Sequence, residues 1–246
     1  KTSFTKKQKG KRNFSRETNM KKIGVILADT QEYIPFVEFY SDIPSEKTFI
    51  GNNEINIYKD GGKEIIAVHC GIGKVNAANA AAALIYRYGC DTVLNAGLSG
   101  AVSGLRREDL VAGSTYIECD FDLTAIGYEL GVKPDEENVH KADQKLLEYA
   151  TSLEDFHVKQ GALGTGDVFL ADKEKKNLYK ETFGIKAFDM ESAAIAAVCS
   201  KNGVSFLSVR KISDDADDVS ADNYREMNDR REAVLATVIS EIIAKI

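Results

Sequence analysis

Three acidic side chains and one arginine stand where predicted strands give way to loops or helices. Glu32 follows an apolar run in the segment A-D-T-Q-E, and Glu191 begins a helix of small residues in F-D-M-E-S-A-A. Arg210 and Asp214 close a late apolar run in V-R-K-I-S-D-D-A-D. Open α/β sheets bind ligands at the carboxyl ends of their strands, so these side chains are candidates for one site. Carboxyl groups there can transfer protons or stabilise a developing positive charge.

Each candidate also has an ordinary structural explanation when it is taken alone. Glu191 can complement the dipole of its helix, Asp214 can cap a turn, and Glu32 can be a solvated acid on a helix surface. Phe169, in T-G-D-V-F-L, is by default a core aromatic residue. Arg210 is different, because an arginine late in an apolar strand needs a partner or a ligand.

The elements that must position these residues alternate between strands and helices, which predicts an α/β fold: a single three-layer α/β/α domain with a central mixed sheet. Asp60-Gly61-Gly62 is a hairpin signal, and Gly89 stops an Ala-rich helix. The predicted strands are residues 22–28, 56–59, 64–70, 91–97, 111–119, 161–166, 185–188 and 204–212, and the predicted helices are residues 73–88, 173–183, 191–201 and 223–246.

Charge divides the chain into two parts. Residues 1–22 carry nine basic side chains and one acidic one, whereas the remainder carries 23 basic and 37 acidic residues. We interpret residues 1–21 as a basic, disordered extension that lacks the apolar stretch of a secretory signal, and residues 22–246 as the domain. The acidic body argues against a nucleic-acid partner. No apolar run is long enough for a transmembrane helix, so we expect no membrane partner.

Cysteine and histidine usage argues against a metal. The four cysteines are not closely paired, and the three histidines occur without C-x-x-C or H-E-x-x-H motifs. The segment C-G-I-G-K lacks the spacing of a dinucleotide-binding or phosphate-binding loop, and its glycines can simply permit tight packing of a strand on a helix. We therefore expect a cytoplasmic protein with free thiols and without metal or cofactor.

Six segments occur in an order that resembles the nucleoside phosphorylase superfamily, most closely its methylthioadenosine/S-adenosylhomocysteine nucleosidase branch. They are G-V-I-L-A-D-T-Q-E, G-I-G-K-V-N-A-A, N-A-G-L-S-G, T-G-D-V-F-L, F-D-M-E-S-A-A-I-A and V-R-K-I-S-D-D-A-D. The resemblance spans roughly residues 21–246, and M-E-S-A-A-I-A and R-K-I-S-D-D-A-D are its most specific parts. It implies an enzyme that hydrolyses the bond between a purine base and its ribose.

The resemblance also implies roles for the polar side chains. Asp214 would protonate N7 of the leaving purine, and Ser213 would orient that acid. Glu191 would bind the 2′- and 3′-hydroxyls of the ribose. Glu32 would hold and activate the attacking water, with Arg210 nearby.

The remaining implied roles enclose the substrate. Phe169 would stack on the base, and the backbone of Leu170 would read its edge. Met190 and Ile72 would line the ribose and its 5′ side. Residues 121–128 resemble a family loop that reaches into a neighbouring subunit's site, which predicts a homodimer.

The chemistry of the reaction fits this division of roles. Breaking an N-glycosidic bond builds positive charge on the sugar and negative charge on the base, so the base needs an acid and the sugar needs anionic groups. Asp214 lies beside Asp215, Asp217 and Asp218, and we expect like-charge crowding to raise some of these pKa values. We expect Glu191, at a helix start, to stay ionised.

The chain departs from the family pattern at four positions. Leu98 stands where a serine would face the water or phosphate in N-T-G-S-A-G, and Ser99 comes one position later and can point elsewhere. Asp29 occupies a place where methionine is common, and Asp189 replaces a frequent glutamate. These changes leave the 5′ substituent and the water site open.

Three functions compete. A hydrolase of adenine nucleosides such as methylthioadenosine or S-adenosylhomocysteine is favoured over a purine nucleoside phosphorylase. The reason is that A-D-T-Q-E offers acids, which repel phosphate, where related phosphorylases carry G-D-P-x-R. The third alternative is a nucleoside-binding protein without turnover, and Leu98 keeps it open.

Overall fold

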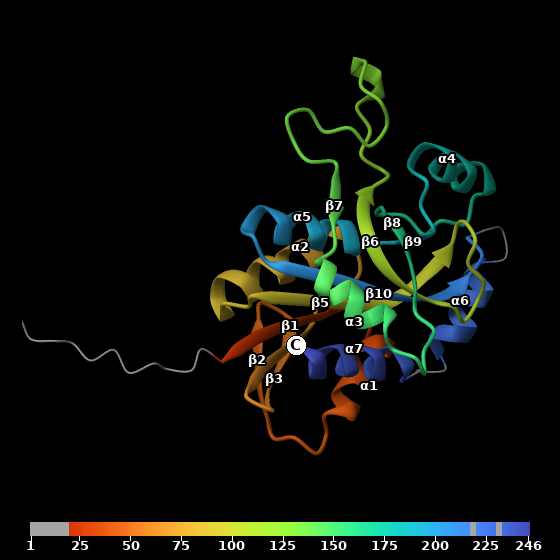
Figure 1. Ribbon diagram of the computed structural model, residues 1–246. Helices are drawn as coiled ribbons and strands as arrows, with labels where there is room; N and C mark the ends of the chain where they lie inside the picture. Colours follow the sequence, from red (N-terminus) through yellow and green to blue (C-terminus); the bar gives the residue numbers. More distant parts are fainter. Residues whose placement is uncertain (1–19, 217–219, 230–232) are drawn as a thin grey trace, which may run out of the picture.

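The computed structural model describes residues 20–216, 220–229 and 233–246, and a ten-stranded mixed sheet runs through it (Figure 1). The strands are β1 (Lys21–Leu27), β2 (Ser45–Ile50), β3 (Asn53–Asp60), β4 (Lys63–His69), β5 (Thr92–Ala101), β6 (Leu110–Glu118), β7 (Val139–Lys141), β8 (Lys159–Thr165), β9 (Ala187–Asp189) and β10 (Ser205–Asp214).

Part of the sheet closes on itself. β5 pairs with β10, β10 with β6, β6 with β8, β8 with β9, and β9 again with β5. β1, β4, β3 and β2 extend outward from β5 as an open sheet, and β7 is added to β6. The carboxyl ends of β1, β5 and β10 share one edge, because these three strands are parallel to one another. The residues that follow them are thereby brought together.

Helices cover both faces of the sheet (Figure 1). α2 (Lys74–Ala83), which continues as a π-helical turn (Leu84–Tyr88), and α5 (Ser192–Asn202) pack on one apolar core. α1 (Thr30–Phe39), α3 (Gln144–Thr151) and α7 (Val234–Lys245) pack on the other. α4 (Lys173–Phe183) and α6 (Ser220–Asp229) lie toward one end of the sheet.

The α/β class, the mixed sheet and every predicted strand agree with the structure. The hairpin at residues 60–62 joins β3 to β4, and Gly89 ends the Ala-rich helix in the left-handed conformation. The four cysteines are free and buried. Among the described residues, every helix is too short or too polar to cross a lipid bilayer. The predicted extension, residues 1–21, lies outside the described part except for its last two residues.

The prediction of one long closing helix over residues 223–246 is wrong. The structure has two helices there, α6 and α7, which serve different surfaces. α7 is apolar and buries Leu235, Val238 and Ile239 against the sheet. α6 is polar and packs beside the end of β10, where one straight helix could not cover both surfaces.

Candidate active site

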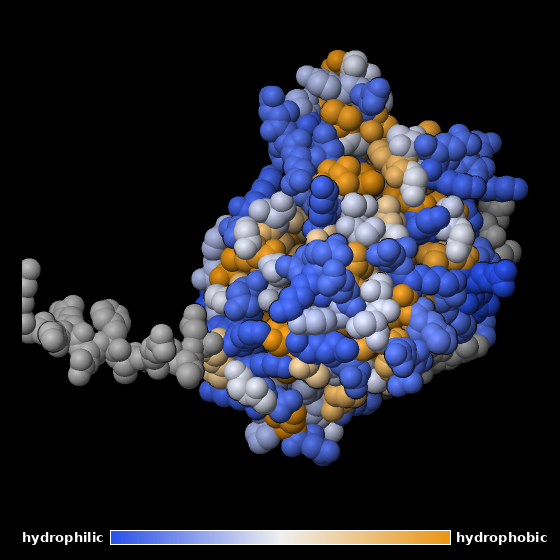
Figure 2. Space-filling model, in the orientation of Figure 1, coloured by the Kyte–Doolittle hydropathy of each residue, from blue (hydrophilic) through white to orange (hydrophobic). Residues whose placement is uncertain are grey.

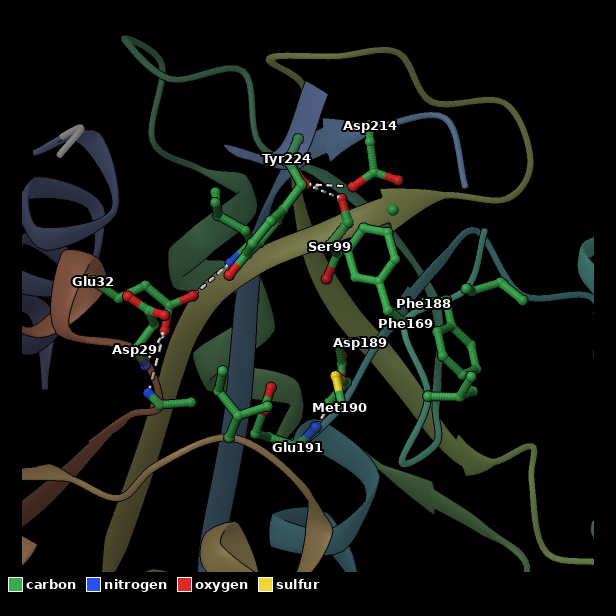
Figure 3. Close-up of a pocket in the computed structure, with 17 residues that line it drawn as sticks. Asp29, Glu32, Ser99, Phe169, Phe188, Asp189, Met190, Glu191, Asp214 and Tyr224 are labelled. Atoms are coloured by element: carbon green, nitrogen blue, oxygen red, sulfur yellow. Dashed lines mark hydrogen bonds between the residues drawn. The ribbon is translucent and has the colours of Figure 1, made fainter. Parts of the chain in front are cut away.

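A cavity of about 320 Å³ opens at the edge where β1, β5 and β10 end (Figure 3). Its walls come from the β1–α1 junction, the end of β5, the β8–α4 loop, the start of α5, the end of β10 and α6. The lining residues are Ala28, Asp29, Glu32, Ile72, Leu98, Ser99, Gly100, Val168, Phe169, Leu170, Phe188, Asp189, Met190, Glu191, Ser213, Asp214 and Tyr224. Eight of the nine predicted site residues are in this set; only Arg210 is not. The volume is in the usual range for small-molecule sites.

Asp214 is held at the end of β10 by its neighbours in sequence. The Ser213 hydroxyl donates to Asp214 Oδ2 at 2.7 Å, and the Ala216 backbone N–H donates to Oδ1 at 2.8 Å. Asp214 is only 2% exposed, yet it lines the cavity. The hydrogen bond from Ser213 fits the orienting role predicted for it. Asp217 and Asp218, from which crowding was expected, lie outside the described residues.

Glu32 is positioned by a capping box at the start of α1. Its Oε2 accepts hydrogen bonds from the backbone N–H groups of Ala28 and Asp29, while Asp29 accepts from Gln31. Its Oε1 accepts from the Leu98 N–H at 2.9 Å, which ties α1 to β5. Glu32 is therefore no solvated surface acid, and three backbone donors fix its carboxyl group at the cavity wall.

Gly97 lets Glu32 and Arg210 approach the same point of β5. A Cβ atom at this position would stand 2.6 Å from Glu32 Oε1 and 2.5 Å from Arg210 Nη1, distances that real side chains do not tolerate. The glycine in N-A-G-L-S-G therefore has a steric reason that the sequence alone did not reveal.

Arg210 is 1% exposed and lies behind the cavity wall rather than in it. Its guanidinium donates to Asn95 Oδ1 at 2.6 Å and to Glu191 Oε2 at 3.3 Å, and its Nε lies 3.4 Å from Asp189 Oδ2. Although burial alone would lower it, the carboxylates of Asp189, Glu191 and Glu32 raise the pKa of Arg210. The expected partner of this buried arginine is thus a set of carboxylates and an amide.

Glu191 turns into the cavity because Asp189 caps α5 in its place. Asp189 Oδ1 accepts from the N–H groups of Glu191 and Ser192, and the Glu191 side chain makes no capping bond. Glu191 Oε1 accepts instead from Gly73 N–H at 3.1 Å. Gly73 has a φ of 100°, which favours glycine, so the C-G-I-G-K segment supplies a donor to the site as well as a tight turn.

The carboxyl groups of Glu32 and Glu191 hold protons more readily than free carboxyl groups do. Burial, and then the nearby Glu191 carboxylate, raises the pKa of Glu32 to about 7, against the opposing effect of Arg210. Burial also raises the pKa of Glu191, and Arg210 opposes it. That Glu191 is ionised stays a prediction; the groups that favour its charge against the effect of burial are Arg210 and the Gly73 N–H.

Aromatic and apolar side chains form the rest of the wall. Phe169 is 41% exposed and meets Tyr224 of α6 edge-on, with ring centroids 5.5 Å apart. Ile72 is half exposed, whereas Leu170 is buried. Sequence reasoning missed Tyr224, because it placed residues 223–246 in one closing helix and gave this residue no role. Burial and the carboxylates of Asp29, Glu32, Glu191 and Asp214 raise the pKa of its phenol.

The positions that depart from the family pattern all lie in this wall. Leu98 lines the cavity and contributes its backbone N–H to Glu32. Ser99 also lines the cavity rather than pointing away from it. Asp29 is the N-cap of α1. In the described part of the chain, no group of three or more His, Cys, Asp or Glu side chains is arranged to hold a metal ion.

Comparisons with known proteins agree with one another. The model of the phosphorylase superfamily matches residues 22–244. A 5′-methylthioadenosine/S-adenosylhomocysteine nucleosidase from a Geobacillus species is 33% identical over 207 residues, which cover 82% of this chain and 89% of that protein. An aminodeoxyfutalosine nucleosidase from Helicobacter pylori is 28% identical over 228 residues, which cover 91% and 99%.

A solved structure has the same fold. It is the 5′-methylthioadenosine/S-adenosylhomocysteine nucleosidase from Helicobacter pylori with butyl-thio-DADMe-Immucillin-A, and it matches with a TM-score of 0.89 at 28% sequence identity. The match covers 93% of this chain and 100% of that chain.

Proposed function

The chain belongs to the phosphorylase superfamily, and we propose that it is a nucleosidase, a hydrolase that cleaves the N-glycosidic bond of an adenine nucleoside and releases the base. The names of its relatives supply the substrates to test: 5′-methylthioadenosine, S-adenosylhomocysteine and aminodeoxyfutalosine. The domain that carries the activity would be residues 22–246.

One observation carries the proposal: the carboxyl groups of the cavity are divided between two ends. Asp214 stands at one end, beside Phe169 and Phe188, while Glu32 and Glu191 stand at the other (Figure 3). Heterolysis of an N-glycosidic bond needs this arrangement, because the base must receive a proton while the sugar becomes a cation.

At the base end, Asp214 would deliver its proton to N7 of the purine, and Ser213 would hold the carboxyl in place. Phe169 would stack on the base, because aromatic rings favour offset-stacked contacts. The backbone of Leu170 would form hydrogen bonds with the edge of the base. At the sugar end, the Glu191 carboxylate would accept hydrogen bonds from the ribose hydroxyls. Met190 and Ile72 would enclose the ribose and its 5′ side.

Glu32 would hold the attacking water and take its proton as the bond to C1′ forms. Arg210 would act from behind the wall by favouring the charged forms of Glu32 and Glu191. Phosphate is a poor alternative to water, since none of the described residues that line the cavity is basic. Arg210, which contacts Glu191 from behind the wall, is already engaged by carboxylates.

We also propose a homodimer. The segment between β6 and β7, which contains the 3₁₀ turn Thr124–Ile126, protrudes from the body (Figure 1). Apolar side chains are exposed on it (Figure 2), and Ile126 is 70% exposed. Packing against a second copy would bury them.

With methylthioadenosine as its substrate, the enzyme would serve methionine salvage in the cytoplasm.

The decisive experiment is purine release from the three nucleosides, measured with and without phosphate. A nucleosidase releases adenine and a free sugar at a rate that phosphate does not change. Consumption of phosphate with formation of a sugar 1-phosphate would replace this proposal by the phosphorylase. Binding of all three nucleosides without cleavage would replace it by the non-catalytic alternative, with Leu98 as the first residue to revert.

A further inference from the structure

The hydroxyl of Ser99 is a polar group of the cavity wall to which the proposed mechanism gives no role. Ser99 is 4% exposed, lines the cavity, and has no hydrogen-bond partner for its Oγ among the described residues. In Figure 3 its side chain is directed into the space enclosed by the labelled residues. By contrast, the hydroxyls of Ser208 and Ser213, which are also buried near the site, both have partners. A buried hydroxyl without a partner is costly, and such groups are rare in folded proteins.

The backbone of β5 fixes where this hydroxyl points. Before it, the Leu98 N–H donates to Glu32; after it, a Cβ atom on Gly100 would stand 2.9 Å from Asp214 Oδ1. The Ser99 carbonyl accepts from the Ser213 hydroxyl at 3.3 Å. Ser99 therefore lies on β5 between the contact with the sugar end and the contact with the base end.

We propose that Ser99 is a substrate-binding residue that donates a hydrogen bond to the nucleoside where base and sugar join. This inference rests on the proposed nucleosidase function, which sets the orientation of the substrate. A purine nucleoside offers two acceptors there, the ring oxygen O4′ and N3 of the base. O4′ gains positive charge during cleavage, so a donor to it would oppose the reaction. N3 gains electron density as the base leaves, and we assign it as the acceptor.

The matched ligand pair is 5′-methylthioadenosine and its 3-deaza analogue, in which a C–H replaces N3. For each protein, the preference is the kcat/KM of the normal nucleoside divided by that of the 3-deaza analogue. This preference should be about 3- to 10-fold larger in the wild type than in Ser99→Ala, since a neutral hydrogen bond contributes a factor of about that size. An equal preference in the two proteins would overturn the proposal. If wild type cleaves neither nucleoside, the proposed function fails, and calorimetric binding of adenine and 3-deazaadenine makes the same comparison without turnover.

The free protein gives a second readout that a merely structural serine would not give. Because Ser99→Ala removes an unsatisfied hydroxyl, the Tm of the ligand-free protein should rise by a few degrees while nucleoside binding weakens. Tyr58→Phe is the matched control, because the Tyr58 hydroxyl is also buried and without a partner but belongs to the core under α1 and α7. It should leave KM and kcat unchanged. A lower Tm for Ser99→Ala with unchanged nucleoside binding would overturn the proposal.

Discussion

The two ends of the cavity are built in different ways. At the end where we propose that the base binds (the base end), Asp214 receives its hydrogen bonds from Ser213 and Ala216, which lie within two residues of it along the chain. At the end where we propose that the sugar binds (the sugar end), Glu32 and Glu191 come from α1 and the start of α5, and they are tied together through β5, β10 and Gly73. The hydrogen bonds that hold Asp214 are local in sequence, whereas those that hold Glu32 and Glu191 join distant elements of the fold.

Because of this difference, we expect substitutions at the two ends to have different effects on the free energy of unfolding. A conservative change of Asp214 should disturb the core less, because the hydrogen bonds to its carboxyl come from Ser213 and Ala216, which are adjacent in sequence. The sugar end buries Glu32 and Glu191 near Arg210, so removing the arginine takes away the cation that favours their charged forms. The same burial that raises the pKa of Glu32 and Glu191 makes this end expensive to disrupt.

The largest effect is therefore expected from Arg210→Met. It removes the cation that faces Asp189 and Glu191, and breaking a buried ion pair in this way lowers the free energy of unfolding by about 3–5 kcal/mol. Asp214→Asn should change the free energy of unfolding by less than about 1 kcal/mol. Denaturant unfolding of the two variants measures both values, and equal stability of the two would contradict the difference between the two ends.

Glu191→Gln should lower kcat/KM for ribosides by about 10- to 100-fold, because a hydrogen bond to a charged acceptor is lost. The 2′-deoxy analogues should lose much less, since they lack the 2′-hydroxyl. Parallel kinetics on both substrates decide the role: equal losses would show that Glu191 does not recognise that hydroxyl.

The pH dependence of the sugar end follows from the raised pKa of Glu32. If water activation needs its carboxylate, kcat/KM should rise with pH through about 7 and fall about tenfold per unit well below it. Stability should move in the opposite direction. A carboxyl whose folded-state pKa is raised contributes stability that is complete below about 4.5, and this contribution is lost as pH rises through about 7.

Glu32→Gln should flatten both profiles in this range, because it removes the titrating group but retains a side chain of the same size. A wild-type rate that is flat from about two units below to about one unit above the expected midpoint of about 7 would remove Glu32 as the base.

The smallest effect is expected from Leu98→Ser. Glu32 is held by the Leu98 backbone N–H, which the substitution retains, so turnover should stay within about threefold or rise slightly if the new hydroxyl contacts the water. Steady-state kinetics on one nucleoside suffice as the measurement. A loss of tenfold or more would mean that the leucine side chain itself shapes the site.

The same division explains what could be predicted from the sequence. The strands and the hairpin follow from apolar runs and turn residues, and Ser213 beside Asp214 is visible as a dipeptide. The partnership of Asn95 with Arg210 joins two strands far apart in sequence, and the steric reason for Gly97 requires knowing that Glu32 and Arg210 approach it. No local pattern encodes either.

Some elements were missed for identifiable reasons. α1 contains Pro35 and several aromatic residues, which hide its helical period. Tyr224 and the boundary between α6 and α7 were missed because residues 223–246 were interpreted as one amphipathic helix, although α6 is polar and α7 is apolar. The closure of β5 onto β10 and β9 is a property of long-range pairing. The sequence therefore predicted the neighbour that holds Asp214 better than it predicted the contacts that hold Glu32 and Glu191.

The most direct test of the account compares Asp214→Asn and Glu32→Gln on two leaving groups. Release of adenine from 5′-methylthioadenosine needs protonation of the base, whereas 4-nitrophenyl riboside carries a leaving group that departs as an anion. Asp214→Asn should slow adenine release by about 100-fold or more and leave nitrophenol release within a few-fold of wild type. Glu32→Gln should slow both by similar factors, because it acts on the sugar. If Asp214→Asn slows both leaving groups equally, Asp214 is not the acid of the base end, and the division between the two ends is contradicted.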